Sequence, residues 1–198
     1  MMTLKKSILF VILILVIDQV SKIYIKTNFV LNEEVFVFDW FRIHFIENDG
    51  MAWGVELPGN YGKLFLTFFR ILAVGGIFWW MKDAIEKKSS NILVVSIALI
   101  LAGALGNIID CVFYGVIFNS SVNEVATLFS NDPYGTWFQG EVVDMLYFPI
   151  WKGYLPEWLP IWGGKYFTFF NAIFNVADAA ISVGVMLLII FNRKIFKD

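Results

Sequence analysis

Two Asn-x-x-Asp motifs, each inside or beside an apolar stretch, are the groups of this chain best suited to chemistry. The first is "NIID", with Asn107 and Asp110, and the second is "NVAD", with Asn175 and Asp178. Residues three apart share one face of a helix, so each amide lies beside its carboxylate. An Asp at the centre of a membrane helix costs about 2.5–3.5 kcal/mol, and such residues usually face a polar interior and act there. The repeated motif therefore predicts one shared polar site.

Other polar residues in apolar surroundings are candidates for the same site. Asp18 and Lys22 are spaced i, i+4 and could pair, and Arg70 is a further cation within a predicted membrane helix. Interhelical hydrogen bonding is an equally good interpretation of Asp18, Lys22 and Asp110. It is weaker for Asp178, which has no cation within two turns of its own helix.

Asp144 lies in a second type of apolar setting, after "VV" and before "ML" in the stretch "QGEVVDMLYFP". Such a carboxylate is either a surface charge at the edge of a strand or part of a site. The local sequence alone favours the surface charge.

The elements that must position these groups are membrane helices. Apolar residues make up 59% of the 198 residues and charged residues only 16%, which does not fit a soluble globular domain. Four segments, 7–25, 63–81, 91–110 and 167–191, are long and apolar enough to cross a hydrocarbon core of about 30 Å. The fold class is therefore predicted to be an all-α polytopic membrane protein, with residues 1–198 forming one domain. The first segment lacks a small-x-small cleavage site, so we expect an uncleaved helix rather than a signal peptide.

The orientation follows from the basic residues. Residues 1–6, 82–90 and 192–198 hold eight Lys and Arg in 22 positions, whereas residues 26–63 and 111–167 hold five in 95. The positive-inside rule then places both termini in the cytoplasm and the connections 26–62 and 111–166 outside. With this topology the polar residues gather in the outer half of the membrane, with Asp178 eleven residues into the fourth helix.

The outer connections are expected to fold. The stretch "EEVFVFDWFRIHFIENDG" contains two apolar-rich runs and closes with an Asn-Asp-Gly turn signal, which predicts a small extracytoplasmic β-sheet. Its single histidine, His44, is interpreted as packing or surface. Five tryptophans in these loops suit the interfacial level of a membrane: Trp53, Trp137, Trp151, Trp158 and Trp162.

Five short motifs, in order along most of the chain, resemble the lipoprotein signal peptidases (signal peptidase II), which are bacterial membrane aspartyl peptidases. They are "DQVSK" at 18–22, "ENDGMAWG" at 47–54, "GALGNIID" at 103–110, "VVD" at 142–144 and "FNVADAAIS" at 174–182. Each motif alone is weak, but all five in order on a chain with four apolar segments are a specific match.

The resemblance implies that Asp144 and Asp178 form the catalytic pair. It assigns Asn48 and Gly50 to an outer loop over the substrate, and it assigns Asp18, Lys22, Asn107, Asp110 and Asn175 to a supporting polar shell. The implied reaction is cleavage of a prolipoprotein before its diacylglyceryl-modified Cys, by water held between two carboxylates that share a proton, with no metal or cofactor. The implied setting is the bacterial cytoplasmic membrane and its lipids. We expect a monomer, and the net charge of −2 gives no reason to expect nucleic-acid binding.

The chain also departs from the family pattern. The family commonly has Arg after the Asp of its third motif, where this chain has Cys111, so Arg70 or Lys22 would have to supply the positive charge. Cys111 is not expected to be a nucleophile, because peptidase thiols need an activating His. The spacings from Asp110 to Asp144 and from Asp144 to Asp178 are 34 residues each, longer than usual in the family.

Two functions of other classes remain as alternatives. A proton-coupled transporter would use Asp18, Asp110 and Asp178 as a relay, but the chain shows no inverted repeat and almost no polar residues in its inner half. A non-enzymatic scaffold would leave Asp178 unexplained.

Overall fold

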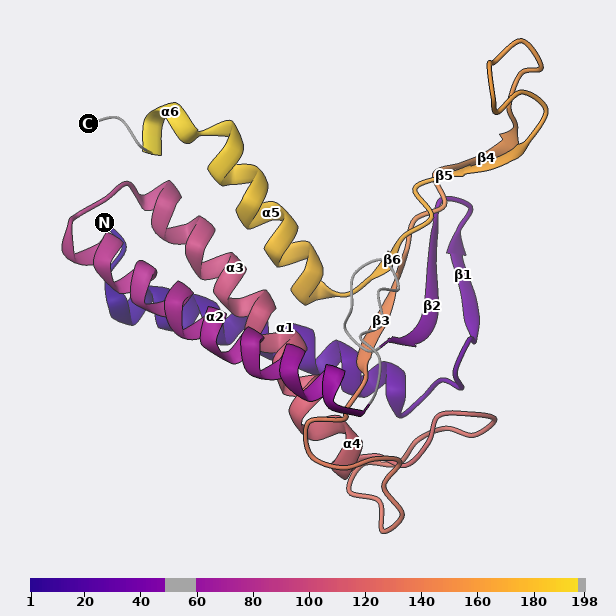
Figure 1. The fold of residues 1–198 in the computed structure, drawn as a ribbon, viewed down its shortest axis with the longest axis horizontal. Helices are drawn as coiled ribbons and strands as arrows, with labels where there is room; N and C mark the ends of the chain where they lie inside the picture. Colours follow the sequence, from indigo (N-terminus) through magenta and orange to yellow (C-terminus); the bar gives the residue numbers. More distant parts are fainter. Residues whose placement is uncertain (49–59, 196–198) are drawn as a thin grey trace.

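Three long apolar segments form the helices α1 (Leu4–Lys26), α2 (Asn60–Glu86) and α3 (Asn91–Ile109) (Figure 1). The computed structural model describes residues 1–48 and 60–195. The side chains of Thr3 and Ser90 accept hydrogen bonds from backbone N–H groups at the starts of α1 and α3, as N-cap residues do. Each helix includes the segment predicted for it, apart from the last residue of the third. All three are long and apolar enough to cross a membrane.

The third helical segment continues well beyond its predicted end at residue 110. A π-helical turn, η2 (Asp110–Tyr114), follows α3 and leads into the short helix α4 (Gly115–Ile117). The sequence after Asp110, "CVFYGVI", is apolar and contains no proline, so the backbone stays helical. Asp110 therefore lies within a helical segment and not at its outer end.

The predicted fourth span, 167–191, is wrong in its first nine residues. They include most of strand β5 (Tyr166–Phe169) and all of strand β6 (Ile173–Phe174), and helix α5 (Val176–Ile190) begins after Asn175, with a short α6 (Asn192–Ile195) behind it. A short apolar run rich in aromatic residues can be helix or strand, and strand pairing decides here. Asp178 is consequently in the first turn of α5 and not eleven residues into a helix.

Two small antiparallel sheets make the all-α class wrong in part. The larger sheet has the order β1 (Glu34–Phe38), β2 (Phe41–Asn48), β3 (Val142–Tyr147), β6, and the smaller pairs β4 (Trp151–Tyr154) with β5. The predicted sheet of the first connection thus exists; the second connection adds β3 to it, and the first part of the predicted fourth span adds β6. The rest of the predicted turn after Asn48, including Gly50, lies outside the described residues.

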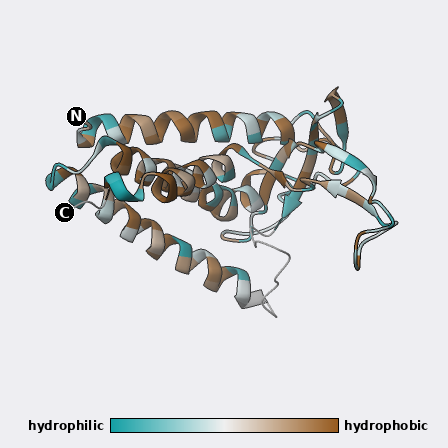
Figure 2. Cartoon of the chain, turned by 90° about the horizontal axis from the view of Figure 1, so that it is seen from above, coloured by the Kyte–Doolittle hydropathy of each residue, from teal (hydrophilic) through white to brown (hydrophobic). Residues whose placement is uncertain are grey.

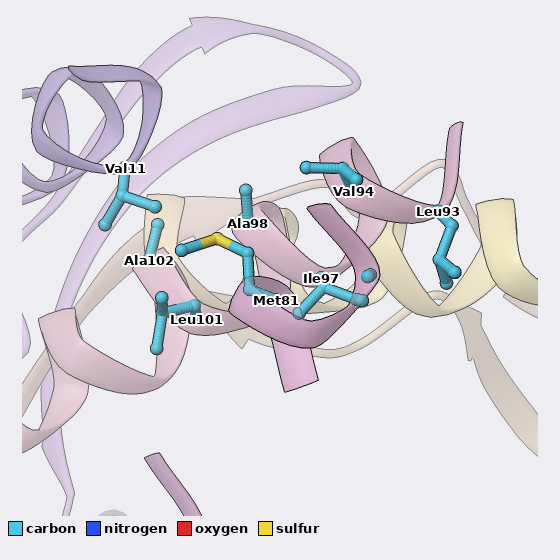
Figure 3. Packing of buried hydrophobic residues seen from close by; sticks show 9 residues of the cluster. Val11, Met81, Leu93, Val94, Ile97, Ala98, Leu101 and Ala102 are labelled. Carbon is cyan, nitrogen blue, oxygen red and sulfur yellow. The ribbon is translucent and has the colours of Figure 1, made fainter. Parts of the chain in front are cut away.

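A packed apolar cluster holds α1, α2 and α3 together (Figure 3). Its buried members are Val11, Met81, Ala84, Leu93, Val94, Ile97, Ala98, Leu101 and Ala102. Outside this cluster, α1 and α2 expose apolar side chains such as Val20 and Phe65, as expected of a surface that faces lipid. Figure 2 shows the apolar colouring along the helices.

A second apolar cluster joins the C-terminal end of α1 to the sheet and to the loop that follows α4. It contains Ile25, Phe45, Tyr114, Phe118, Ala126, Val143 and Met145. The N-terminus, α6 and the α2–α3 connection lie at the opposite end of the helices from the sheets (Figure 1). The polar residues described next lie where the helices meet the larger sheet.

Candidate active site

The pairing of β3 with β6 brings Asp144 to the start of α5. Leu146 pairs with Phe174, so the next residue of the chain, Asn175, lies beside Asp144. Asn175 Nδ2 donates to Asp144 Oδ1 at 2.7 Å and to the backbone oxygen of Val143 at 3.2 Å. Asn48 Nδ2, at the end of β2, donates to Asp144 Oδ2. Both carboxylate oxygens of Asp144 are thereby held by amides from neighbouring strands or their ends.

A capping box holds Asp178 at the beginning of α5. Asn175 Oδ1 accepts from the backbone N–H of Asp178 at 2.8 Å, and Asp178 Oδ2 accepts from the backbone N–H of Asn175 at 3.5 Å. A carboxylate in the first turn also interacts favourably with the helix dipole. The cost expected of an Asp at the centre of a membrane helix therefore does not arise at this position.

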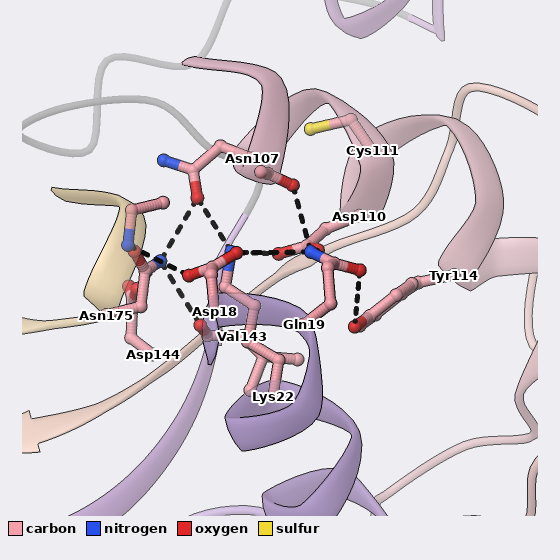
Figure 4. A network of polar contacts seen from close by, with 12 residues as sticks. Asp18, Gln19, Lys22, Asn107, Asp110, Cys111, Tyr114, Val143, Asp144 and Asn175 are labelled. Carbon is pink, nitrogen blue, oxygen red and sulfur yellow. Dashed lines mark hydrogen bonds and ion pairs between the residues drawn. The ribbon is translucent and has the colours of Figure 1, made fainter. Parts of the chain in front are cut away.

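Asn107 of α3 connects the start of α5 to α1 (Figure 4). Its Nδ2 donates to Asp178 Oδ1 at 2.8 Å. Its Oδ1 accepts from Lys22 Nζ at 2.9 Å and from Asn175 Nδ2 at 3.2 Å. The amide of Asn107 thus links Asp178 and Asn175 to a buried cation, and Asn175 in turn contacts Asp144.

Lys22 is the charge at the centre of this network (Figure 4). Its Nζ lies 3.0 Å from Asp18 Oδ2 and 2.7 Å from Asp110 Oδ2, and all three side chains are at most 1% exposed. Gln19 Nε2 donates to Asp110 Oδ1 at 2.9 Å and to Asp18 Oδ2 at 3.1 Å, and Tyr114 Oη donates to Gln19 Oε1 at 3.2 Å. Buried charges need such pairing, and here it joins α1 to the segment that follows α3.

Close packing of α3 against α5 depends on a small residue beside this cluster. A Cβ atom added at Gly106 would lie 2.6 Å from Asp18 Oδ2 and 3.1 Å from the Cβ of Ala177. Asp18 Oδ1 in turn accepts from the backbone N–H of Ala177 at 2.8 Å. Asp18 therefore satisfies one of the free N–H groups at the start of α5, next to Asp178.

The electrostatic setting of Asp144 favours its neutral form. Burial, with only 5% of the residue exposed, raises the pKa of Asp144 to about 8, and the nearby charge of Asp178 adds to this effect. Lys22 and the hydrogen bond from Asn175 act in the opposite direction and are outweighed. A proton is thus expected on Asp144 at neutral pH, next to the half-buried Asp178.

Eight of the ten residues predicted for the site lie in this network: Asp18, Lys22, Asn48, Asn107, Asp110, Asp144, Asn175 and Asp178. Arg70 contacts Cys111 instead, with Nη1 3.6 Å from Sγ. Lys22 is the cation that pairs with Asp110, and Arg70 approaches the side chain that follows it in the sequence. Gly50 lies outside the described residues.

Two parts of the network were missed by the sequence analysis. Gln19 lies within the first motif but was not singled out, although its spacing of three from Lys22 places both on one helix face. Lys26, counted only as a loop charge, is fully buried and pairs with Glu47 of β2, and its Nζ donates to Ser121 Oγ at 2.9 Å. Asp18, Lys22 and Lys26 follow one another at i, i+4, i+8, a stripe that could have been recognised.

The arrangement provides two carboxylates of different character at the boundary between helices and sheet. One is buried, which raises its pKa to about 8, and the other is half-buried at a helix N-terminus. Such a pair can act as acid and base on one water molecule. Among residues 1–48 and 60–195, no three His, Cys, Asp or Glu side chains form a cluster able to hold a metal ion.

Comparison with known proteins agrees with this interpretation. The family model of signal peptidase (SPase) II matches residues 10–193. The chain is 49% identical over 182 residues to a lipoprotein signal peptidase of Porphyromonas gingivalis, covering 91% of this chain and 79% of that protein. It is 39% identical over 189 residues to the lipoprotein signal peptidase of Amoebophilus asiaticus, covering 92% and 75% of the two chains.

A solved structure supports the same assignment. The chain matches a bacterial membrane enzyme determined by the in meso method, with a TM-score of 0.65 and 28% identity, over 96% of this chain and 94% of that one. Since a family model covers nearly the whole length and the two relatives named above are 49% and 39% identical, the chain belongs to the signal peptidase II family of membrane aspartyl peptidases.

Proposed function

We propose that this chain removes the signal peptide from diacylglyceryl-modified prolipoproteins, with Asp144 and Asp178 as the catalytic pair. The observation that carries the proposal is the amide network around the two carboxylates. Asn175 contacts both Asp144 and Asp178, and Asn107 contacts Asp178 at 2.8 Å. Because these amides also hold α3, α5 and β3 together, the position of Asp144 relative to Asp178 is fixed.

The proposed reaction begins with a water molecule between the two acids. The carboxylate of Asp178 takes a proton from the water, and the resulting hydroxide attacks the carbonyl carbon of the bond before the lipidated Cys. Asp144 donates its proton to the developing oxyanion. When the C–N bond breaks, Asp178 passes the proton from the water to the leaving amine. Asp144 takes back a proton from a hydroxyl of the tetrahedral intermediate as the new carboxyl group forms, so that the site ends with the proton it began with. The raised pKa of Asp144 makes it the proton donor of the pair.

The surrounding residues have supporting roles in this proposal. Lys22 pairs with both Asp18 and Asp110, and these three side chains hold α1 against the start of α5. Asn48 orients Asp144 from the end of β2. Gly50, outside the described residues, is proposed to help cover the substrate, and Arg70 supplies positive charge on the side of Cys111.

We also propose that the chain crosses the bacterial cytoplasmic membrane four times, with both termini in the cytoplasm. The fourth crossing is α5, followed by α6; the 15 residues of α5 extend about 22 Å at 1.5 Å per residue, and α6 continues the chain after Phe191. The excess of basic residues at the termini and in the α2–α3 connection supports this orientation. The site then faces the outer surface, where water is available and where the lipid-modified segment of a precursor lies.

The whole chain is proposed to act as one membrane domain and as a monomer. All the groups described in the site come from a single chain, from α1, α3, the π-helical turn, β2, β3 and α5. The two carboxylates and water suffice for the hydrolysis, so no cofactor is included. Its partners are the lipidated precursor and the membrane lipids that surround it.

A direct cleavage assay tests the proposal. The purified protein in lipid bilayers is incubated with two synthetic precursor peptides of the same sequence, one carrying a diacylglyceryl-Cys and one an unmodified Cys. We expect cleavage immediately before the Cys in the lipidated peptide only. Cleavage at another bond, or no cleavage of the lipidated peptide, would contradict the proposed function.

A further inference from the structure

The hairpin formed by β4, β5 and the loop between them has no role in the network described above. It lies between β3, which carries Asp144, and β6, which leads into the helix of Asp178. It projects from the larger sheet and away from the helices (Figures 1 and 2), and β4 and β5 make their main contacts with each other. We refer to residues 150–170 as the aromatic hairpin.

The strand register gives the aromatic hairpin two different faces. Trp151 pairs with Phe169, and Gly153 pairs with Phe167, so these residues share one face. A Cβ atom at Gly153 would lie 2.8 Å from the Trp151 side chain, so this indole lies against the glycine and widens the apolar surface.

The opposite face carries amino and hydroxyl groups. It carries Lys152 paired with Thr168 and Tyr154 paired with Tyr166. Lys152 Nζ lies 5.3 Å from the centre of the Tyr147 ring. The hairpin is therefore amphipathic, and no element among the described residues packs as a layer against its apolar face.

The tip of the hairpin is even more exposed and apolar. Trp158 is 78%, Ile161 85% and Trp162 62% exposed. Along the whole aromatic hairpin, Lys152, Glu157 and Lys165 are the only charged residues. An exposed surface of this kind marks a binding site for a membrane or a protein, and an isolated two-stranded hairpin is only marginally stable without such cover.

The position of the hairpin in the chain favours lipid as its cover. β5 ends at Phe169 and α5 begins at Val176, so the hairpin lies within about 25 Å of a helix that enters the membrane. Bilayer lipid is therefore always within reach, at a higher effective concentration than a separate protein. Trp and Tyr are the residues enriched where a membrane meets water.

We propose that the aromatic hairpin is a membrane-interface anchor, whose apolar face and tip lie among the lipid headgroups beside the helices. Trp151, Phe167, Phe169 and the tip residues face the lipid, and Lys152 and Thr168 face the water. The anchor is a second contact with the bilayer, outside the helices that cross it.

Site-directed spin labelling tests this proposal without reference to catalysis. Single cysteines are introduced at Ile161, Phe167, Lys152 and Asn123 in a Cys111→Ser background, labelled, and reconstituted into phosphatidylethanolamine–phosphatidylglycerol vesicles. Asn123, an exposed residue of the other outer insertion, is the matched control, and Lys152 controls for the opposite face of the same hairpin. Relaxation by oxygen, which concentrates in lipid, is compared with relaxation by a water-soluble nickel chelate.

We expect labels at Ile161 and Phe167 to relax several-fold more with oxygen than with nickel, and labels at Lys152 and Asn123 to show the reverse. Equal nickel accessibility at Ile161 and Asn123 would mean that the hairpin stands in water, and the proposal would be wrong. Protection of Ile161 and Phe167 from both reagents would mean that protein covers the hairpin, and this too would overturn the lipid assignment. If the substitution at Phe167 disturbs the strands, the label at Ile161 in the loop still decides the question.

Discussion

Replacing Lys22 by Met removes the only cation that contacts both Asp18 and Asp110 among the described residues, at 3.0 and 2.7 Å, and leaves both carboxylates buried. Breaking a buried charge pair in this way usually costs about 3–5 kcal/mol. Asp18 keeps the N–H of Ala177 and Asp110 keeps Gln19, so the lower end of the range applies. We expect the free energy of unfolding to fall by about 3 kcal/mol, a factor of about 100 in the unfolding equilibrium constant.

The matched control is Lys82→Met, which removes another lysine of an i, i+4 pair in a membrane helix. Lys82 Nζ lies 3.7 Å from Glu86 Oε1, and the two side chains are 54% and 65% exposed. An exposed pair contributes little, so this variant should lose less than about 0.5 kcal/mol. Both variants are unfolded by titration with dodecyl sulfate in mixed micelles and followed by tryptophan fluorescence.

The double variant Lys22→Met, Asp110→Asn distinguishes charge from packing. Removing the charge of Asp110 should restore part of the stability lost with Lys22. Without Lys22, both Asp18 and Asp110 are buried carboxylates with no cation beside them among the described residues, and Asp110→Asn removes one of these two unpaired charges. If Lys22→Met unfolds like Lys82→Met, the buried cluster does not hold α1 against α5, and the role given to it here is wrong.

Four further predictions concern the chemistry and the orientation. Asp144→Asn and Asp178→Asn should each reduce precursor cleavage by at least about 100-fold while thermal stability is kept, since each removes one proton-transfer group; near-normal cleavage by either variant would refute the two-aspartate mechanism. Cleavage should decline as pH rises through about 8, because the raised pKa of Asp144 means that its required proton is lost there, and an unchanged rate at pH 9 would exclude it as the proton donor. Cys111→Ser should keep most activity, because the buried thiol has no activating histidine beside it, and complete loss would indicate a cysteine mechanism. A cysteine at Asn123 should react with an impermeant reagent from outside, and one at Lys87 only after the membrane is opened; the opposite labelling would reverse the proposed topology.

The three long helices could be predicted because the relevant signal is local. Each span in α1, α2 and α3 depends on the apolar character of its own residues, and α3 begins at Asn91 as predicted. The strands β1 and β2 were likewise indicated by their alternation and by the turn signal. The choice of Asp144 was different, since its local sequence favoured a surface charge and only the order of five motifs pointed to a site.

The start of the fourth helix could not be obtained in the same way. The run 167–174 is as apolar as a membrane helix, yet Phe174 pairs with Leu146 and Ile173 pairs with Tyr147. This strand pairing forms backbone hydrogen bonds between two segments that are distant in the sequence. The free energy of these hydrogen bonds is not included in a hydropathy average over one segment. The strand pairing is also what moves Asp178 from a helix interior to a first turn.

The sequence by itself determined three things: that the chain is a membrane protein, that basic residues are concentrated at its termini and in the α2–α3 connection, and which acidic residues match the signal peptidase II motifs. Only the tertiary structure decided how these acids are related. Asn107 reaches both Asp178 and Lys22, and Asn175 reaches Asp144. The physical reason is that a pKa or a hydrogen bond depends on the distance between atoms of different segments, and burial of Asp144 under neighbouring elements raises its pKa to about 8. The residue types were readable along the chain, but their partners were set by packing.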